Sequence, residues 1–404
     1  MKKNFVLFSL LSLSLYGFSG VVVDATTKKP IMGATITNSS TIAYSSISGN
    51  FTLDSNETTY SVKAYGYKPF HGKNKNIFSE IYLKPIEVKA LYLSFWNASN
   101  NSKKLKHILD IIDSTQLNSI VVDVKNEYGL TSFRTSFAQA NSYGADKQRT
   151  NKNIKKFMQE LKKRKIYTIA RIVTFKDELQ AQNNPEYAVR ENNGTIWRNH
   201  DGMAWVDPFD KRSHKYAISI AEEAAKVGFD EINFDYIRFP AKSSLIFSKK
   251  NTQENRVKAI ESFLALAKKR LQKYGVYISV DTYGNVCWSK DDCNIGQTIP
   301  SLIKYADYLS PMLYPSGFAS GSFRVKYPAE HPYKVIYNSI ANIEDEVNPI
   351  RIRPWLQHFK DYTYTKKHYK KKEISAQIQA TKDLKTGGWL MWSPTNRYYK
   401  DYFH

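Results

Sequence analysis

The chain has 404 residues, 42% of them hydrophobic and 24% charged, which is ordinary for a soluble globular protein of two or three domains. Its formal net charge is +22, but the lysines lie in short runs spread over expected helices and loops, and no nucleic-acid-binding motif accompanies them. The charge therefore favours a dispersed, solvated surface, with an acidic polymer substrate as a minor alternative and no nucleic-acid partner.

Residues 1–19 have the pattern of a secretory signal peptide. Two lysines precede an apolar run, and small residues follow at Gly17 and Ser19, which predicts cleavage after Ser19. The run is shorter than the ~20 residues that a spanning helix needs, and no later stretch approaches that length. We therefore expect an exported protein, periplasmic or extracellular, without stable membrane insertion. An uncleaved membrane anchor is the alternative.

Residues 20–86 alternate short strand-like runs with turns rich in Gly, Pro, Asn and Asp, which predicts a small β-sandwich. The informative positions are Gly20, Val22, Asp24, Pro30, Gly33, Ala34, Ser48, Gly49, Asn50, Phe51, Ala64, Gly66 and Tyr67. With these residues the stretch resembles the carboxypeptidase-regulatory-like (transthyretin-like) domain. The resemblance implies an accessory module that carries no chemistry.

Residues 87–404 alternate strand-like and helix-like stretches, a pattern typical of βα units around a parallel sheet. Amphipathic helices are expected at 153–165, 215–228 and 254–275. The expected strands are 88–96, 119–127, 167–175, 230–239, 277–284, 307–315, 351–359 and 387–394. Eight such strands predict an α/β fold, a (β/α)8 TIM barrel following the small all-β sandwich. A doubly wound sheet is disfavoured, because no glycine-rich phosphate turn follows the first strand.

Acidic side chains are expected inside the barrel, on strands that are otherwise apolar. Strand residues alternate between faces, and the Ile and Phe neighbours of Asp235 face the helices, so Asp235 points inward. By the same alternation Asp281 and Asp123 point inward on their own strands. Barrel active sites lie at the carboxyl ends of the strands, where these acids and Glu127 would converge. The counter-charges expected beside them are Lys125, Arg171 and Arg238.

Carboxylates combined with aromatic side chains at this rim indicate a carbohydrate site, because sugar rings stack on Trp and Tyr while carboxylates accept their hydroxyls. Glycoside hydrolysis requires two carboxyl groups, one acting as acid and the other as nucleophile or base. Asp235 and Asp281, on adjacent strands at equivalent height, are the predicted catalytic pair. Which of them is the acid, and whether configuration is retained or inverted, stay open. The residues predicted to bind substrate are Asp123, Lys125, Glu127, Arg171, Asp177, Trp205, Asp207, Arg238, Tyr283, Tyr314, Gln357 and Trp392.

Six stretches of this region together carry a family resemblance. They are VVDVK (121–125), ARIVTFKD (170–177), AWVDP (204–208), GFDEINFDYIRFP (228–240), SVDTYG (279–284) and SPMLYP (310–315). With them the chain resembles, over about residues 88–400, a family of glycoside hydrolases that was long catalogued as a domain of unknown function. The resemblance implies a barrel related to other glycosidases.

YADYLSPMLYP and GGWLMWS give a more distant likeness to the family 18 chitinases. Their fourth strand carries D-x-x-D-x-D-x-E, with the Glu as proton donor. In that register this chain has Asp230, Asn233, Asp235 and Ile237, so the catalytic Glu is absent. The difference argues against chitinase-type substrate-assisted cleavage and assigns the proton transfer to Asp235, Asp281 or an acid on the second strand.

Other chemistry has little support in the sequence. Cys287 and Cys293 lie close together, and in an exported protein a small-loop disulfide is favoured over two free thiols. The eight histidines are scattered and no H-E-x-x-H occurs, so neither a metal nor another cofactor is expected.

Two functions are compatible with these features. The first is an exported glycoside hydrolase that cleaves a cell-envelope or extracellular polysaccharide by two-carboxylate acid/base chemistry. The alternative is a non-catalytic glycan-binding or scaffold protein built on the same barrel. The intact carboxylates favour the first, and the missing chitinase-type Glu keeps the second open. In both cases the partner is a polysaccharide or oligosaccharide.

Overall fold

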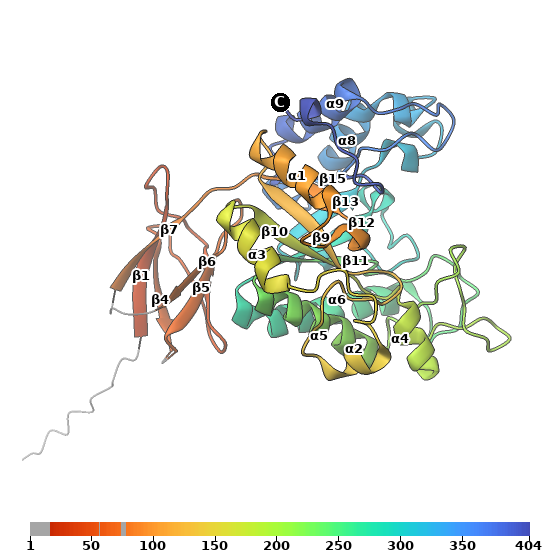
Figure 1. Ribbon diagram of the computed structural model, residues 1–404, viewed down its shortest axis with the longest axis horizontal. Coiled ribbons are helices and arrows are strands. Elements are labelled where there is room, and N and C mark those ends of the chain that lie inside the picture. Colours follow the sequence, from red (N-terminus) through yellow and green to blue (C-terminus); the bar gives the residue numbers. More distant parts are fainter. Residues whose placement is uncertain (1–16, 56, 74–77) are drawn as a thin grey trace, which may run out of the picture.

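The computed structural model describes residues 17–55, 57–73 and 78–404, so most of the predicted signal peptide lies outside the described residues. The described chain forms a small all-β unit followed by a closed barrel surrounded by helices (Figure 1). This arrangement confirms the predicted fold class. None of the described helices is long and apolar enough to cross a membrane.

The small unit is a β-sandwich of two sheets, with strand orders β4-β1-β7 and β3-β2-β5-β6. Apolar residues from both sheets share one core, as the alternating pattern requires. Phe18 belongs to this core: it is 2% exposed and packs against Phe51 and Tyr60. The strands are β1 (Gly17–Asp24), β2 (Thr35–Thr37), β3 (Ile42–Tyr44), β4 (Asn50–Asp54), β5 (Thr59–Lys63), β6 (Phe70–Lys73) and β7 (Phe78–Leu83).

The first three residues of β1 belong to the segment that the sequence pattern predicts as a signal peptide. Gly17 and Ser19 pair with β4, so the strand begins before the expected cleavage point. Composition alone does not separate the two elements, because the apolar run of a leader and the first strand of a sandwich are both rich in large hydrophobic residues.

The barrel closes through parallel pairing of eight consecutive strands, β8 to β15, with β15 next to β8. All eight expected strands are present, and each ends earlier than expected on the carboxyl side. β11 ends at Asp235 because Tyr236 adopts a left-handed backbone conformation (φ 50°), which turns the chain out of the sheet. The strands are β8 (Val88–Leu93), β9 (Ser119–Lys125), β10 (Tyr167–Val173), β11 (Glu231–Asp235), β12 (Tyr277–Tyr283), β13 (Tyr308–Met312), β14 (Trp355–Gln357) and β15 (Gly388–Trp392).

Helices pack on the outside of the barrel through their apolar faces. α5, for example, begins where the Asp210 side chain accepts the N–H of Arg212 and ends at Gly228, whose φ of 100° suits a glycine. The helices are α1 (Lys103–Asp113), α2 (Ala138–Tyr143), α3 (Ile154–Lys163), α4 (Glu178–Asn183), α5 (Lys211–Val227), α6 (Gln253–Leu271), α7 (Ile299–Ile303), α8 (Pro332–Ala341) and α9 (Lys371–Asp383).

Two hydrophobic layers result from the alternation of the strands. Ile232 and Phe234 lie in the outer layer with the helices, while Tyr92 and Trp355 lie in the inner layer inside the barrel. This confirms the predicted facing of β11, and it fixes the inward direction of Asp235.

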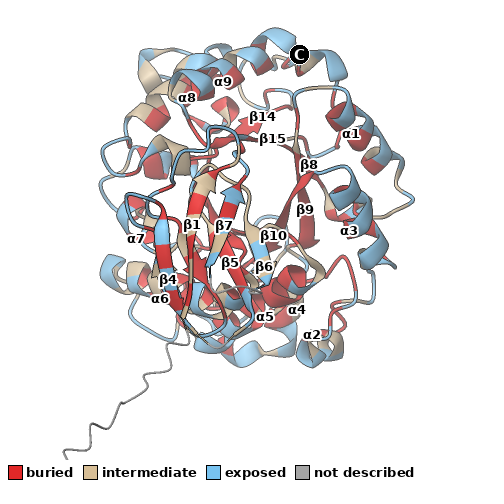
Figure 2. Cartoon of the chain, turned by 90° about the vertical axis from the view of Figure 1, so that its left-hand side faces the viewer, coloured by how far each residue is buried: buried red, intermediate tan, exposed pale blue. Residues whose placement is uncertain are grey.

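The sandwich covers the amino-terminal end of the barrel; in Figure 2 its strands lie in front of the barrel strands. The Tyr277 hydroxyl donates to the carbonyl of Ala64 (2.7 Å) and accepts its N–H (3.0 Å). Lys63 forms an ion pair with Asp307 at 3.1 Å. Tyr277 is the first residue of β12, so these contacts lie at the opposite end of the barrel from the expected active site.

Candidate active site

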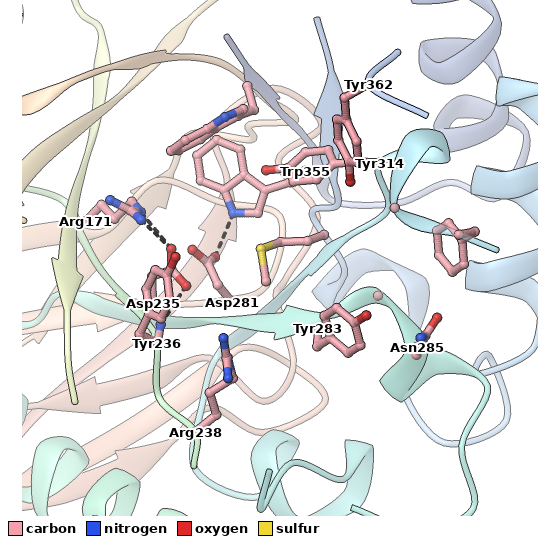
Figure 3. Close-up of a pocket in the computed structure, with 15 residues that line it drawn as sticks. Arg171, Asp235, Tyr236, Arg238, Asp281, Tyr283, Asn285, Tyr314, Trp355 and Tyr362 are labelled. Carbon is pink, nitrogen blue, oxygen red and sulfur yellow. Dashed lines mark hydrogen bonds and ion pairs between the residues drawn. The ribbon is translucent and has the colours of Figure 1, made fainter. Parts of the chain in front are cut away.

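A cavity of about 350 Å³ lies at the carboxyl end of the barrel, a size suited to a small ligand or a few sugar rings. It contains both predicted catalytic acids, Asp235 and Asp281, on the neighbouring strands β11 and β12 (Figure 3). Its lining residues are Arg171, Asp235, Tyr236, Arg238, Asp281, Tyr283, Gly284, Asn285, Met312, Tyr314, Gly317, Phe318, Trp355, Tyr362 and Trp392.

Asp235 is the last residue of β11, and both of its carboxylate oxygens accept hydrogen bonds. Oδ2 accepts from Arg171 Nε (2.9 Å) and Nη2 (2.5 Å), and Oδ1 accepts from the backbone N–H of Tyr236 (2.6 Å). The left-handed conformation of Tyr236 accompanies this last contact. With a guanidinium on one oxygen and an amide on the other, both oxygens of Asp235 accept hydrogen bonds, which favours the carboxylate form.

Asp281 on β12 has a different environment. Its Oδ1 accepts from Asn233 Nδ2 (2.8 Å) and Trp355 Nε1 (2.7 Å), whereas its Oδ2 is buried and has no hydrogen-bond partner among the described residues. Burial raises the pKa of Asp281 well above its ordinary value, and the negative charge of Asp235 raises it further. A buried carboxyl beside a like charge is favoured in its protonated form.

Arg171 joins the cavity to a third acid behind it. Its Nη1 donates to Asp123 Oδ1 at 2.5 Å, and the hydroxyl of Tyr92 also donates to Asp123. Burial raises the pKa of Asp123, although the Arg171 charge opposes that shift. Trp392 stacks on Tyr92 with ring centroids 3.8 Å apart and lies 5.3 Å from the Arg171 guanidinium. Asp123 therefore contacts the site through Arg171 rather than lining the cavity.

Ile237 occupies the position at which a family 18 chitinase carries its acid. It is fully buried in the outer layer, because the turn at Tyr236 interrupts the alternation of β11. The structure thus leaves no carboxyl group at this position, and the acids of the cavity are Asp235 and Asp281.

Seven of the predicted site residues line the cavity together, and the others do not. The predicted residues that line the cavity are Arg171, Asp235, Arg238, Asp281, Tyr283, Tyr314 and Trp392.

Lys125 and Asp177 are two predicted site residues that do not line the cavity. They form a fully buried ion pair with each other at 2.8 Å, and Asp177 also caps α4. A register shift between β9 and β10 pairs Lys125 with Ile172, a residue of the outer layer, so simple alternation fails at that point.

The remaining predicted residues have contacts with the scaffold. Trp205 lies in the outer layer, 5.6 Å from the Tyr236 ring. Asp207 accepts the backbone N–H groups of Phe209 and Ser248, and Gln357 binds Ser316 and Gln377. Glu127 follows β9, is partly buried and does not line the cavity. None of these predicted residues lines the cavity.

Four lining residues carried no signal in the sequence. They come from the loops and short 3-10 turns that follow the strands, which are too short or irregular to show a periodic pattern. These residues are Asn285, Gly317, Phe318 and Tyr362. Tyr362 is placed by Asp361, whose carboxylate accepts backbone N–H groups of Thr363 and Thr365. An aspartate followed by two threonines at positions +2 and +4 is the pattern that could have indicated an ordered loop.

Both cysteines are free thiols in the structure, so the expected disulfide is not formed. Cys287 is buried, and that burial raises the pKa of its thiol to about 12. Across the described ranges, no group of three or more His, Cys, Asp or Glu side chains is arranged to hold a metal ion.

A closed parallel barrel with two acids and several aromatic residues in its carboxyl-end cavity has the architecture and residue types of a glycoside hydrolase. Residues 90–398 match a protein family described as "putative glycosyl hydrolase domain". The chain belongs to this family, which confirms the predicted enzyme class. No curated protein sequence matches the chain.

Solved structures also resemble the chain. A hypothetical protein from Ruminiclostridium thermocellum is 35% identical over 47% of this chain and 96% of its own, with a TM-score of 0.42. The glycoside hydrolase domain of PgaB (BpsB) from Bordetella bronchiseptica is 13% identical over 79% of this chain and 99% of its own, with a TM-score of 0.55. The spore cortex-lytic enzyme SleL of Bacillus megaterium is 13% identical over 82% and 74%, with a TM-score of 0.46. The Bordetella domain shares the barrel fold.

Proposed function

We propose that the protein is an exported glycoside hydrolase that cleaves a polysaccharide of the cell envelope or the extracellular space, with Asp281 as the general acid and Asp235 as its ionised partner. The leader-like pattern of residues 1–19 supports export, and family membership supports glycan hydrolysis. The aromatic lining of the cavity, which includes Tyr283, Tyr314 and Trp392, suits the apolar faces of sugar rings.

The observation that carries the assignment of roles is the unequal hydrogen bonding of the two carboxyl groups. Asp235 has donors on both oxygens, as a carboxylate requires, whereas Asp281 has a buried Oδ2 without a partner. A proton on Oδ2 would remove the uncompensated charge and give that oxygen a donor for the glycosidic oxygen.

The chemistry then follows the two-carboxylate scheme. Asp281 protonates the leaving oxygen as the glycosidic bond breaks, and Asp235 either attacks the anomeric carbon or removes a proton from the attacking water. Arg171 holds the Asp235 carboxylate in place with two donated hydrogen bonds. Both carboxyl groups are buried, so water screens their charges little and these interactions are strengthened.

The test is the release of new reducing ends from a panel of neutral, amino-sugar and acidic polysaccharides. Asp281→Asn and Asp235→Asn should each lower kcat/KM by at least about 10³-fold, because each removes one of the two groups that the reaction needs. Asp345→Asn, at an exposed position after α8, is the matched control and should match the wild type.

Binding separates hydrolysis from the alternative function. If the wild type binds a glycan without releasing reducing ends, the protein is a glycan-binding module and the proposed chemistry is wrong. If both Asp variants retain full activity, the catalytic pair is wrong although the enzyme class stands.

A further inference from the structure

Arg238 lines the cavity but has no role in the proposed mechanism, in which Arg171 is the positive group beside Asp235. It lies three residues after Asp235, and in Figure 3 it extends toward Tyr236 and the two carboxyl groups. Its guanidinium lies 5.0 Å from the Trp205 ring and 5.3 Å from the Tyr236 ring. These two aromatic contacts restrict the orientation of the guanidinium.

Other cations around this end of the barrel have acidic partners. Arg171 binds Asp123 and Asp235, and Lys176 binds Asp201 at 3.0 Å. Within the described ranges, Arg238 forms no ion pair; its one hydrogen bond runs from Nη1 to the carbonyl of Phe239, at 3.1 Å. Several of its five N–H donors are therefore available to a ligand.

A guanidinium in this position is costly unless something compensates its charge. Burial lowers the pKa of Arg238, an effect that the charges of Tyr236, Asp235 and Tyr283 oppose. Arginine nevertheless stays charged in proteins, so the cavity keeps a fixed positive group beside the catalytic pair. A planar guanidinium fork fits a planar carboxylate through two parallel hydrogen bonds.

We propose that Arg238 binds the carboxylate of a uronic acid residue, so that the substrate is an acidic polysaccharide cleaved next to that residue. This inference rests on the proposed function, because it names the substrate class of the same cavity. The overall charge of +22 agrees with it, since a basic protein concentrates polyanions near its surface.

Binding measured without turnover tests the inference. The full chain carrying Asp281→Asn is titrated calorimetrically with oligomers of galacturonate, mannuronate and glucuronate, each beside its carboxyl-reduced, neutral counterpart. At least one uronate oligomer should bind about 10- to 100-fold more tightly than its reduced form, the range expected for a hydrogen-bonded charge pair. Adding Arg238→Gln should remove that difference and leave the affinity for the reduced form unchanged.

Two further variants make the result specific. Arg238→Lys keeps the positive charge but lacks the planar guanidinium with its two parallel donors. This variant should therefore prefer uronate more than Arg238→Gln does and less than the chain with Arg238. Arg134→Gln, a substitution of a largely exposed arginine outside the cavity lining, should retain the full preference.

Several outcomes would overturn the inference: equal binding of acidic and reduced oligomers, equal weakening of both by Arg238→Gln, no binding of any uronate, or tighter Arg238-dependent binding of sulfated oligomers. Its failure is distinguishable from failure of the proposed function. Arg238-independent cleavage of a neutral glycan would leave the hydrolase assignment intact. Arg238-dependent uronate binding without cleavage by the wild type would instead leave only the uronate-binding role of Arg238 and would contradict the proposed hydrolysis.

Discussion

Arg171 donates two hydrogen bonds to Asp235 Oδ2, from Nε at 2.9 Å and from Nη2 at 2.5 Å, while its third nitrogen binds Asp123. One guanidinium on β10 thus holds two buried carboxylates, which come from β9 and β11, the strands on either side of it. Burial opposes its charge, but Asp123 and Asp235 outweigh that effect and raise the pKa of Arg171 well above its ordinary value. Arg171 is a positioning residue in this arrangement, and its substitution gives the first prediction.

Arg171→Gln should lower kcat by about 10²- to 10³-fold with a smaller change in KM, because Asp235 loses its fixed orientation. Arg171→Lys should recover only part of the rate, since a compact ammonium lacks the planar fork that orients both carboxylates. Steady-state kinetics on the cleaved glycan, with circular dichroism as a check of folding, measures both. An equal fall in rate for Gln and Lys, with folding intact, would contradict the positioning role.

The pH dependence of the enzyme should depend on Trp355, whose indole N–H binds Asp281. That hydrogen bond lowers the pKa of Asp281 against the larger raising effect of burial. Trp355→Phe should therefore raise the pKa of Asp281 further and move the alkaline limb of the kcat/KM profile to higher pH. The limb lies on the alkaline side because activity requires protonated Asp281 and falls as pH rises through its pKa.

The same shift has a consequence for stability with a defined sign. A carboxyl group whose pKa is raised by folding stabilises the folded state below its ordinary pKa, and this contribution is lost as pH rises through the raised value. Asp281→Asn should accordingly flatten the decline in stability with rising pH, as measured by denaturant unfolding over a pH series.

The kinetic prediction for Trp355 has its own contradicting outcome. If Trp355→Phe leaves the alkaline limb of the kcat/KM profile where it is in the wild type, that limb belongs to a group other than Asp281.

Substrate affinity should depend on the loop that carries Tyr362. The Asp361 carboxylate accepts the N–H groups of Thr363, Thr365 and Lys366. Burial opposes its charge, but these donors and the threonine hydroxyls outweigh burial and lower the pKa of Asp361. Asp361→Ala removes these hydrogen bonds, so the loop must be ordered when substrate binds. The variant should therefore raise KM by about 10-fold with kcat nearly unchanged. An unchanged KM would show that Tyr362 has no contact with substrate.

The contact between the sandwich and the barrel should affect stability and not catalysis. Tyr277→Phe removes the hydroxyl that binds the N–H and carbonyl of Ala64, and it should lower the free energy of unfolding by about 1–2 kcal/mol. The kcat/KM value should not change, because Tyr277 begins β12 and Asp281 lies near its other end. Tyr305→Phe, a partly exposed position on the barrel, is the control.

The residue at which the chain starts should affect stability through Phe18. A chain beginning at Gly17 should be about 3 kcal/mol more stable than one beginning at Gly20, since the shorter chain loses a large side chain from the sandwich core. Thermal unfolding of the two chains measures the difference, and Phe18→Ala in the longer one should reproduce most of it. Equal stability would show that β1 does not need its first three residues.

Much of the fold was predictable because it depends on short-range regularities. Alternation along 230–239 and 277–284 placed Asp235 and Asp281 on the inner face, and the structure has both in one cavity. The same reasoning failed for Lys125, because a register shift between β9 and β10 changes the facing of the strand, and no local pattern marks that shift.

The sequence by itself determined the architecture, the enzyme class and the two candidate acids, because strand periodicity and residue type are local properties. Only the tertiary structure decided how those acids differ. Hydrogen bonds from Arg171 to Asp235, and from Asn233 and Trp355 to Asp281, join strands that lie far apart in the chain. Proton affinity depends on such surroundings, so the roles proposed for the two aspartates and for Arg238 rest on contacts that only the fold creates.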